Sequence, residues 1–402
     1  MRLQISTLIL LTNYPTISGQ HNHLSRSEHP STGSGRSRRL LRQAQDASAR
    51  SVCTNVGWLV LLTALLLAAC AGAQVTPTEP GPRAIRLMSH DSFAASEDVI
   101  AEFEALHNAR VEFLPSGDAG AALNQAILSK GNPLADVFFG VDNTFLSRAL
   151  EHDIFEPYQS PALADIPDAL ELDAGHRLLP VDYGDVCMNY DQAWFAEHGV
   201  DPPANLEDLT RPAYKGLLVV ENPATSSPGL AFMLATIGHF GEGGWLDFWA
   251  ALRDNDVLVS SGWEDAYWGE STWAGGGDRP IVVSYATSPA AEVYFSEGAM
   301  EEPPTGNVLG SGACFRQIEF IGILAGTENR DLAEKLVDFL LSQRFQEDIP
   351  LQMFVFPAHE GASLPDFYRW AERPAQPAEV AADAIQANRE TWINQWTETV
   401  LR

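Results

Sequence analysis

Hydroxyl and aromatic side chains gather at two points where an apolar run is followed by proline. One segment reads Thr225-Ser226-Ser227-Pro228-Gly229 and the other reads Tyr285-Ala286-Thr287-Ser288-Pro289. Serine or threonine at a helix N-cap accepts a hydrogen bond from an early backbone N–H, and proline loses no hydrogen bond at the first helical position. Two such helix starts facing one cleft would offer free N–H groups and hydroxyls to a ligand oxygen or phosphate. Ordinary helix caps would explain either segment taken alone.

Aromatic residues shift this balance toward a binding site. Trp263, Tyr267 and Trp268 lie between the two segments, and Tyr285 opens the second one. Aromatic rings stack on planar ligands and attract cations to their faces.

Motifs for catalysis are absent from the sequence. It contains no GxSxG, HExxH, P-loop or GxGxxG that opens a helix, and its histidines have no partner at metal-ligand spacing. Asp182-Tyr183-Gly184-Asp185 could serve acid–base chemistry, but no nucleophile stands beside it, so a hinge or ligand-contact role is favoured. We therefore expect no catalytic residue, no metal and no cofactor.

The N-terminal region has the features of an export signal. Residues 58–69 form the run WLVLLTALLLAA, which is too short to span a bilayer but matches a signal-peptide core. Leu67-Ala68-Ala69-Cys70 resembles the lipobox of bacterial lipoproteins, which implies a lipid on Cys70; a non-lipidated signal peptide is the alternative. We expect a leader and signal peptide over 1–70, a tether over 71–83, and a periplasmic or cell-surface location.

Composition narrows the choice of partner. The chain has 53 acidic side chains against 25 Lys and Arg, a formal net charge of −28. Nucleic acid and anionic membrane surfaces bind basic faces, so this balance argues against both. It is compatible with a cationic ligand, and equally with an acidic surface that serves solubility.

Strands alternate with amphipathic helices after the tether. The pattern predicts strands at residues 84–89, 111–114, 136–139, 216–220 and 281–284, and helices at residues 97–107, 121–130, 228–238, 245–255 and 331–341. This alternation is typical of α/β lobes with mainly parallel sheets, and the chain is long enough for two lobes. Cys187 and Cys314 fit no metal spacing and could pair in an oxidising compartment, which the sequence leaves open.

Six segments in this order resemble the periplasmic thiamine-binding proteins of ABC importers. The segments are Asp91-Ser92-Phe93-Ala94-Ala95, Ala135-Asp136-Val137 with Gly140-Val141-Asp142-Asn143, Val181-Asp182-Tyr183-Gly184, Thr225 to Gly229, Gly262-Trp263-Glu264-Asp265-Ala266-Tyr267 and Ser284 to Pro289. The resemblance extends from residue 84 to the C-terminus.

The resemblance implies an α/β, two-lobed type II periplasmic-binding-protein fold with hinge strands that closes on its ligand. It also implies capture of thiamine or its phosphate esters by a monomer that delivers them to an ABC permease and its ATPase, without chemistry. Ligand contacts are implied at Asp118, Ala119, Ser226, Ser227, Trp263, Tyr285, Ala286, Thr287 and Ser288. A thiazolium cation suits aromatic faces and a carboxylate, and an aminopyrimidine can stack.

The implied lobes are discontinuous. Lobe 1 would comprise residues 84–182 with 312–348, and lobe 2 residues 183–311 with 349–402. The chain would cross between lobes near residues 180–188, 311–320 and 349–356, which would put Cys187 and Cys314 near the hinge.

Two departures from the family keep other ligands open. Ala291 stands where the family often has tyrosine and Phe354 where it has tryptophan, and Trp268, Trp273 or Phe295 could compensate. The alternatives are a thiamine precursor, a polyamine or a ferric ion, and iron would call for adjacent tyrosines. A thiamine-degrading enzyme of related fold would need a reactive cysteine, for which only Cys187 or Cys314 could be considered.

Overall fold

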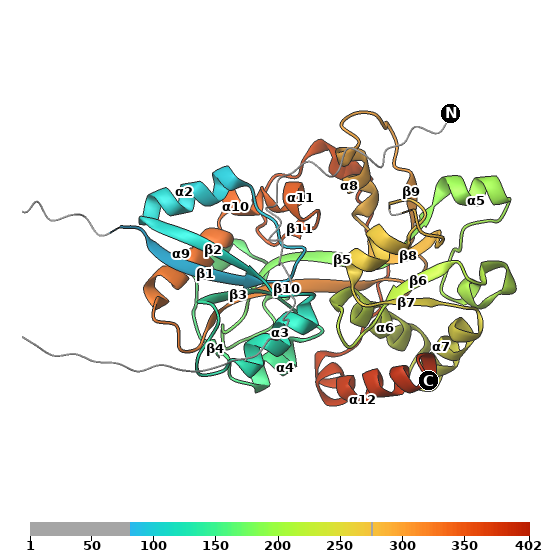
Figure 1. Ribbon diagram of the computed structural model, residues 1–402, viewed down its shortest axis with the longest axis horizontal. Coiled ribbons are helices and arrows are strands. Elements are labelled where there is room, and N and C mark those ends of the chain that lie inside the picture. The colour runs from blue at the N-terminus through green and yellow to red at the C-terminus, as the bar shows by residue number, and fades with distance from the viewer. Residues whose placement is uncertain (1–80, 275) are drawn as a thin grey trace, which may run out of the picture. The chain divides into compact units, whose positions relative to one another are not determined.

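The computed structural model describes residues 81–274 and 276–402, in which the strands form one 11-stranded sheet (Figure 1). The strands are β1 (Arg83–Ser89), β2 (Ala109–Pro115), β3 (Val137–Asp142), β4 (Phe155–Glu156), β5 (Leu179–Asp191), β6 (Leu218–Glu221), β7 (Leu258–Ser260), β8 (Ile281–Tyr285), β9 (Thr305–Val308), β10 (Phe315–Leu324) and β11 (Phe356–Pro357). Their order is β2-β1-β3-β10-β5-β8-β6-β7, with β4 paired to β10 and with β9 and β11 paired to β5.

Helices flank the strands. They are α2 (Glu97–His107), α3 (Ala119–Leu128), α4 (Leu146–Glu151), α5 (Gln192–His198), α6 (Ser227–Phe240), α7 (Trp245–Asp254), α8 (Ser288–Phe295), α9 (Arg330–Leu340), α10 (Gln343–Gln346), α11 (Ile349–Gln352) and α12 (Ala382–Val400). In α9 the apolar residues Leu332, Leu336 and Leu340 recur every four positions and are buried, because residues four apart share one face of a helix. The predicted helices and strands all occur, with ends shifted by a few residues.

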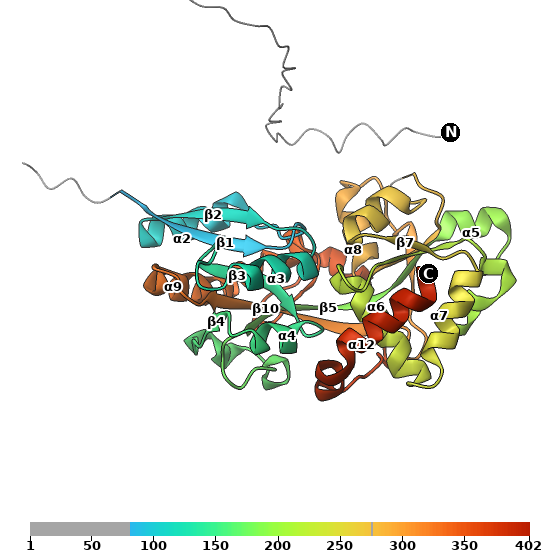
Figure 2. The same cartoon turned by 60° about the horizontal axis from the view of Figure 1, so that its bottom comes forward.

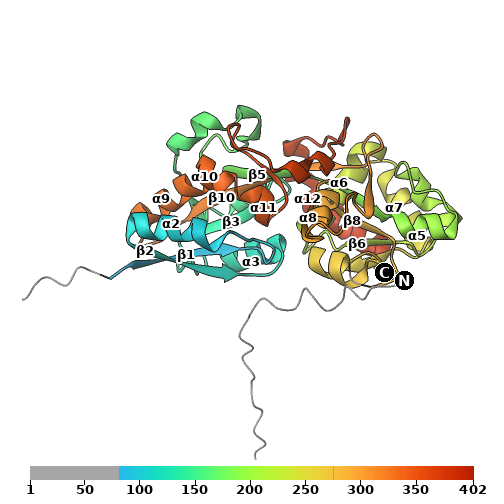
Figure 3. The same cartoon turned by 90° about the horizontal axis from the view of Figure 1, so that it is seen from above.

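Parallel pairs form the two ends of the sheet and antiparallel pairs form its middle. β1 pairs in parallel with β2 and β3, and β6 pairs in parallel with β7 and β8. The long strands β5 and β10 pair antiparallel with each other, and they also join β8 and β3 respectively. We name the β1–β3 end with its helices lobe 1 and the β6–β8 end with its helices lobe 2 (Figure 3). The expected α/β lobes with crossing strands are confirmed, whereas their exact residue boundaries stay a prediction.

Helix α12 packs against elements of both lobes, and helix α6 packs against the strands that connect the two lobes. α12 packs against α7 of lobe 2 and α4 of lobe 1 (Figure 2). α6 is buried along most of its length in lobe 2 and packs against β5, β6, β8 and β10. Gly229 lets α6 start against the end of β6, since a Cβ there would lie 2.5 Å from the carbonyl oxygen of Glu221.

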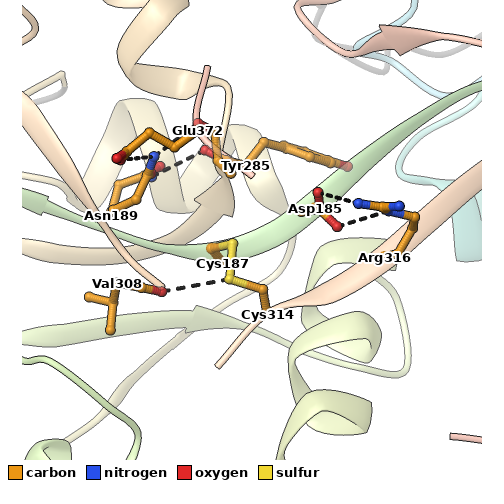
Figure 4. The surroundings of a disulfide bond; sticks show 10 residues. Asp185, Cys187, Asn189, Tyr285, Val308, Cys314, Arg316 and Glu372 are labelled. Atoms are coloured by element: carbon orange, nitrogen blue, oxygen red, sulfur yellow. Dashed lines mark hydrogen bonds and ion pairs between the residues drawn. A yellow bond between two sulfur atoms is a disulfide. The ribbon is translucent and has the colours of Figure 1, made fainter. Parts of the chain in front are cut away.

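A disulfide joins Cys187 of β5 to Cys314, the residue before β10 (Figure 4). The possible pairing that the sequence left open is therefore present. The two cysteines are fully buried with Ala286, next to partly buried Leu309. β5 and β10 are the strands that join the lobes. The disulfide therefore links these two strands covalently at the end that is nearer to lobe 2.

Several expectations lie outside the described residues: the leader and signal peptide, the lipid on Cys70, and nearly all of the 71–83 tether. Within the described residues, no helix combines the length and the apolar character that crossing a membrane requires.

Removing the disulfide should lower stability. The bond closes a loop between cysteines 127 residues apart, and such a loop restricts the unfolded chain. We expect the double variant Cys187→Ser with Cys314→Ser to lose about 2–5 kcal/mol of unfolding free energy, measured by urea denaturation. Equal denaturation midpoints for the parent protein with and without reductant, or two free thiols in unreduced protein comprising residues 71–402, would contradict this.

Candidate functional site

The carboxylate of Asp118 connects the two lobes. Asp118 is the N-cap of α3 in lobe 1, and its Oδ1 accepts a hydrogen bond from the N–H of Ala119 at 2.7 Å. In lobe 2, the N–H of Ser227 donates to Oδ1 and the N–H of Trp263 donates to Oδ2, both at 3.3 Å. A Cβ at Gly262 would lie 2.9 Å from Oδ2, so only glycine leaves room for this approach. Three separate stretches of the sequence therefore meet at Asp118.

Trp263 is the centre of an aromatic group. Its ring stacks on Tyr267 with centroids 5.1 Å apart and planes at 19°. Trp268 and Tyr285 lie edge-on to it, at 6.3 Å and 6.5 Å. The indole N–H donates to Ser284 Oγ at 2.8 Å, which fixes the orientation of the ring. These rings provide the flat, electron-rich faces on which a planar or cationic ligand can bind.

Gln317 connects Tyr285 to both lobes. The hydroxyl of Tyr285 donates to Gln317 Oε1 at 2.7 Å. The amide nitrogen of Gln317 donates to Ser227 Oγ in lobe 2 at 2.9 Å and to Asp142 Oδ2 in lobe 1 at 2.6 Å. Sequence reasoning missed this residue. The sequence signal that could have identified Gln317 is its polar side chain within the largely apolar run of β10. A polar group buried in such a strand needs hydrogen-bond partners.

The two helix starts differ in their caps. At α6, the side chain of Ser226 accepts a hydrogen bond from the N–H of Gly229 at 3.5 Å, as predicted. At α8, the side chain of Thr287 caps nothing, so the same prediction is wrong there. Thr287 has helical backbone angles, φ −88° and ψ −11°, whereas Ser226 has the extended angles of a capping residue. Ser288 instead places its Oγ 2.9 Å from Ser284 Oγ, next to the indole of Trp263.

Ala119 and Ala286 have different surroundings. Ala119 is the first residue of α3, is buried, and contributes its N–H to Asp118. The side chain of Ala286 packs with Cys187 and Cys314, and its carbonyl accepts a hydrogen bond from Asn307 Nδ2 at 3.0 Å. The structure thus brings Asp118, Ser227, Trp263 and Tyr285 together and leaves the Ala286 side chain at the disulfide.

A second aromatic cluster lies where α8 meets the segment before β11. Tyr294 and Phe295 follow Ala291 by one turn of α8, and their rings lie 5.5 Å and 4.8 Å from the ring of Phe354. Both α8 rings are exposed, at 42% and 56%. Phe354 has φ 58°, an unusual conformation for a bulky residue. Phe295, one of the residues considered to compensate for Ala291, therefore packs with Phe354, the other departure from the family.

Several carboxyl groups are buried at the site, and burial favours their neutral, protonated form. Burial raises the pKa of Asp142 to about 7, against the hydrogen bonds it accepts from Thr144 and Phe145. Burial likewise raises the pKa of Asp118, despite three backbone N–H donors. Burial also raises the pKa of Glu221, whose carboxyl oxygens meet no hydrogen-bond donor among the described residues. A cation bound between the lobes would favour the ionised form of these groups instead.

Metal coordination is not supported within the described ranges. No group of three His, Cys, Asp or Glu side chains in residues 81–274 and 276–402 is arranged to hold a metal ion. The groups that the site does contain are rings, carboxylates, hydroxyls and backbone N–H groups.

Known proteins with similar sequences and folds are bacterial solute-binding proteins. The family model of bacterial extracellular solute-binding proteins matches residues 132–382. The thiamine-binding periplasmic protein of Salmonella typhimurium is 28% identical over 84% of this chain and 98% of its own length. The Escherichia coli protein of the same name is 28% identical over 79% of this chain and 94% of its own length. A solved periplasmic thiamin binding protein superposes with a TM-score of 0.70 and 26% identity, over 80% of this chain and 100% of that chain.

Asp142 should make the unliganded protein more stable in mild acid. Its folded pKa of about 7 exceeds the ordinary value of 3.8, so the folded state binds the proton more tightly than the unfolded state. The unfolding free energy therefore falls as pH rises from about 4 to 7, by at most roughly 4 kcal/mol for this group. Asp142→Asn should remove that part of the slope, measured by urea denaturation across this range. An unchanged slope in the variant would refute the assignment.

Proposed function

Because the chain belongs to the family of bacterial extracellular solute-binding proteins, we propose that it captures thiamine, or a phosphate ester of thiamine, and delivers it to an ABC importer. The curated relatives that match over most of their length are thiamine-binding periplasmic proteins. The observation that carries the proposal is the group of Trp263, Tyr267 and Tyr285 rings beside the Asp118 carboxylate.

The chemistry of thiamine fits this group. Its thiazolium is permanently positive, so it gains from the aromatic faces of Trp263 and Tyr285 and from the charge of Asp118. Its aminopyrimidine is planar and can stack on the same rings. Hydroxyls at the starts of α6 and α8, from Ser227 and Ser288, bond to Gln317 and Ser284, and a hydroxyethyl or phosphate tail would share or replace these bonds.

Ligand entry requires the lobes to separate. Asp118 accepts hydrogen bonds directly from the N–H groups of Ser227 and Trp263, and a ligand seated between these residues has to replace those bonds. The lobes are joined by β5 and β10, so small changes in the backbone angles of these strands would open and close the site.

We propose export to the periplasm or cell surface, with a lipid on Cys70 as anchor, and a monomer that meets its permease and ATPase there. Periplasmic relatives support the location. The Cys187–Cys314 bond supports it too, since disulfides persist in oxidising compartments.

The alternatives gain less support. A ferric carrier would need a tyrosine pair, and Ala286 follows Tyr285. A thiamine-degrading enzyme would need a free thiol, whereas both cysteines of the described residues are bonded to each other. A polyamine fits the acidic character but makes less use of the stacked rings, and a pyrimidine precursor can stack but carries no fixed positive charge.

Calorimetric titration with thiamine, thiamine monophosphate and hydroxymethylpyrimidine tests the proposal. We expect thiamine to bind and Trp263→Ala to weaken binding about 100-fold or more, because it removes the ring that contacts both Tyr267 and Tyr285. The matched control is Trp194→Ala on α5, whose ring stacks on His198 of the same helix and should leave affinity unchanged. No heat with any of the three compounds would refute the proposal.

A further inference from the structure

Three carboxyl groups lie in a row across the strands that join the lobes. Glu319 of β10 is the register partner of Asp182 on β5 and of Asp142 on β3. Partners on neighbouring strands project from the same face of the sheet, with Cβ atoms about 4.5–5.5 Å apart. We name Asp182, Glu319 and Asp142 the acidic row; their exposed fractions are 0%, 8% and 0%.

Hydrogen-bond donors reach the acidic row unevenly. Asp142 accepts from the amide of Gln317, from the hydroxyl and N–H of Thr144 and from the N–H of Phe145, whereas Glu319 has His90 Nε2 at 3.2 Å from its Oε1. Neither oxygen of Asp182 meets a donor group among the described residues. Its neighbour Glu319 is itself an acceptor, so a hydrogen bond between these two carboxyls needs a proton on one of them. Three buried carboxyls this close cannot all be ionised together.

The pKa values of Asp142, Asp182 and His90 are all shifted upward. Burial and the adjacent Glu319 raise the pKa of Asp182, and burial raises the pKa of Asp142 to about 7. Burial opposes the positive charge of His90, but the carboxylates of Glu319, Asp118 and Asp91 together outweigh burial and raise the pKa of the imidazole. Protons held here are the ones that a nearby positive charge would displace most readily.

The acidic row acts on the proposed binding site. Burial first, and then the charges of Glu319, Asp142, Asp118 and Asp182, raise the pKa of Tyr285. The same hydroxyl is connected through Gln317 to Asp142. A cation on the face of Tyr285 would therefore lie within the field of the row, and the low dielectric of the interior strengthens that interaction.

We propose that the acidic row supplies the counter-charge that selects a cationic ligand, and that binding of the cation expels a proton from the row or from His90. This inference rests on the proposed function, because it seats the ligand on Trp263 and Tyr285. The cation replaces the proton as the positive charge in the site, and the proton leaves to the solvent buffer. A neutral ligand of the same shape leaves the proton in place and gains no such attraction.

Titratable groups from several elements face the cluster, and the source of the proton follows from them. They are His90 and Asp91 after β1, Asp118 at α3, Asp142, Asp182, Glu319, Tyr285 and Tyr368. Among these groups of the described chain, His90 alone can carry a positive charge. His90→Gln therefore separates the two sources: release that persists comes from the row, and release that stops comes from His90.

Calorimetry of the unmodified protein is the first test. Thiamine is titrated at pH 7 in two buffers of different ionisation enthalpy, and the difference gives the number of protons released. We expect about 0.5–1 proton, with thiamine affinity rising about tenfold between pH 6 and pH 8. A neutral isostere with thiophene in place of thiazolium should release no proton, bind about tenfold or more weaker, and show no pH dependence.

Glu319→Gln tests the row itself, with Asp136→Asn as the matched control. The first change should reduce proton release and weaken thiamine binding about tenfold, without changing affinity for the neutral isostere. Asp136 is a buried carboxyl before the opposite end of β3, bonded to the N–H of Arg86 at 2.8 Å, and its change should alter neither. Thiamine binding without proton release, at the affinity of the isostere, overturns this inference alone. Absence of thiamine binding overturns the proposed function with it.

Discussion

The site depends on the antiparallel pairing of β5 with β10. Gln317 and Glu319 project from β10, and Asp182 projects from β5, so a slip of one residue would turn these side chains to the other face. Two bonds oppose such a slip near the lobe 2 end. The Arg316 guanidinium donates to both oxygens of Asp185, at 3.0 Å and 2.9 Å (Figure 4). The disulfide lies two positions before Arg316, at Cys314. Register is thus fixed by charge and by covalent bond together.

Buried acidity is the cost of a site made for a cation. Carboxyl groups without basic partners weaken a folded core, and natural proteins tolerate such groups where function requires them. Here they cluster where strands of both lobes meet, next to the aromatic rings. Glu292 shows the contrast within lobe 2: burial raises its pKa to about 7, yet it accepts hydrogen bonds from Tyr267 and Thr305 and serves to hold an aromatic ring.

Local signals in the sequence predicted the elements, and some of the site, but not what joins the strands. Apolar periodicity identified α9, and the Ser-Pro-Gly pattern identified the start of α6 with its Ser226 cap. Thr287 also carries a side-chain hydroxyl, but its backbone conformation differs from that of Ser226, so the cap prediction failed there. Gln317 and Glu319 acquire their roles through partners on other strands and helices, up to 175 residues away for Gln317, and no local pattern encodes such register.

The Cys187–Cys314 bond also affects how this molecule would respond to a protease. The bond encloses a stretch that contains all of α6, α7 and α8, together with most of the strands of lobe 2. A single cut anywhere in that stretch leaves both fragments covalently attached. A nicked molecule would therefore keep its subunit mass on a non-reducing gel and separate into two pieces only after reduction.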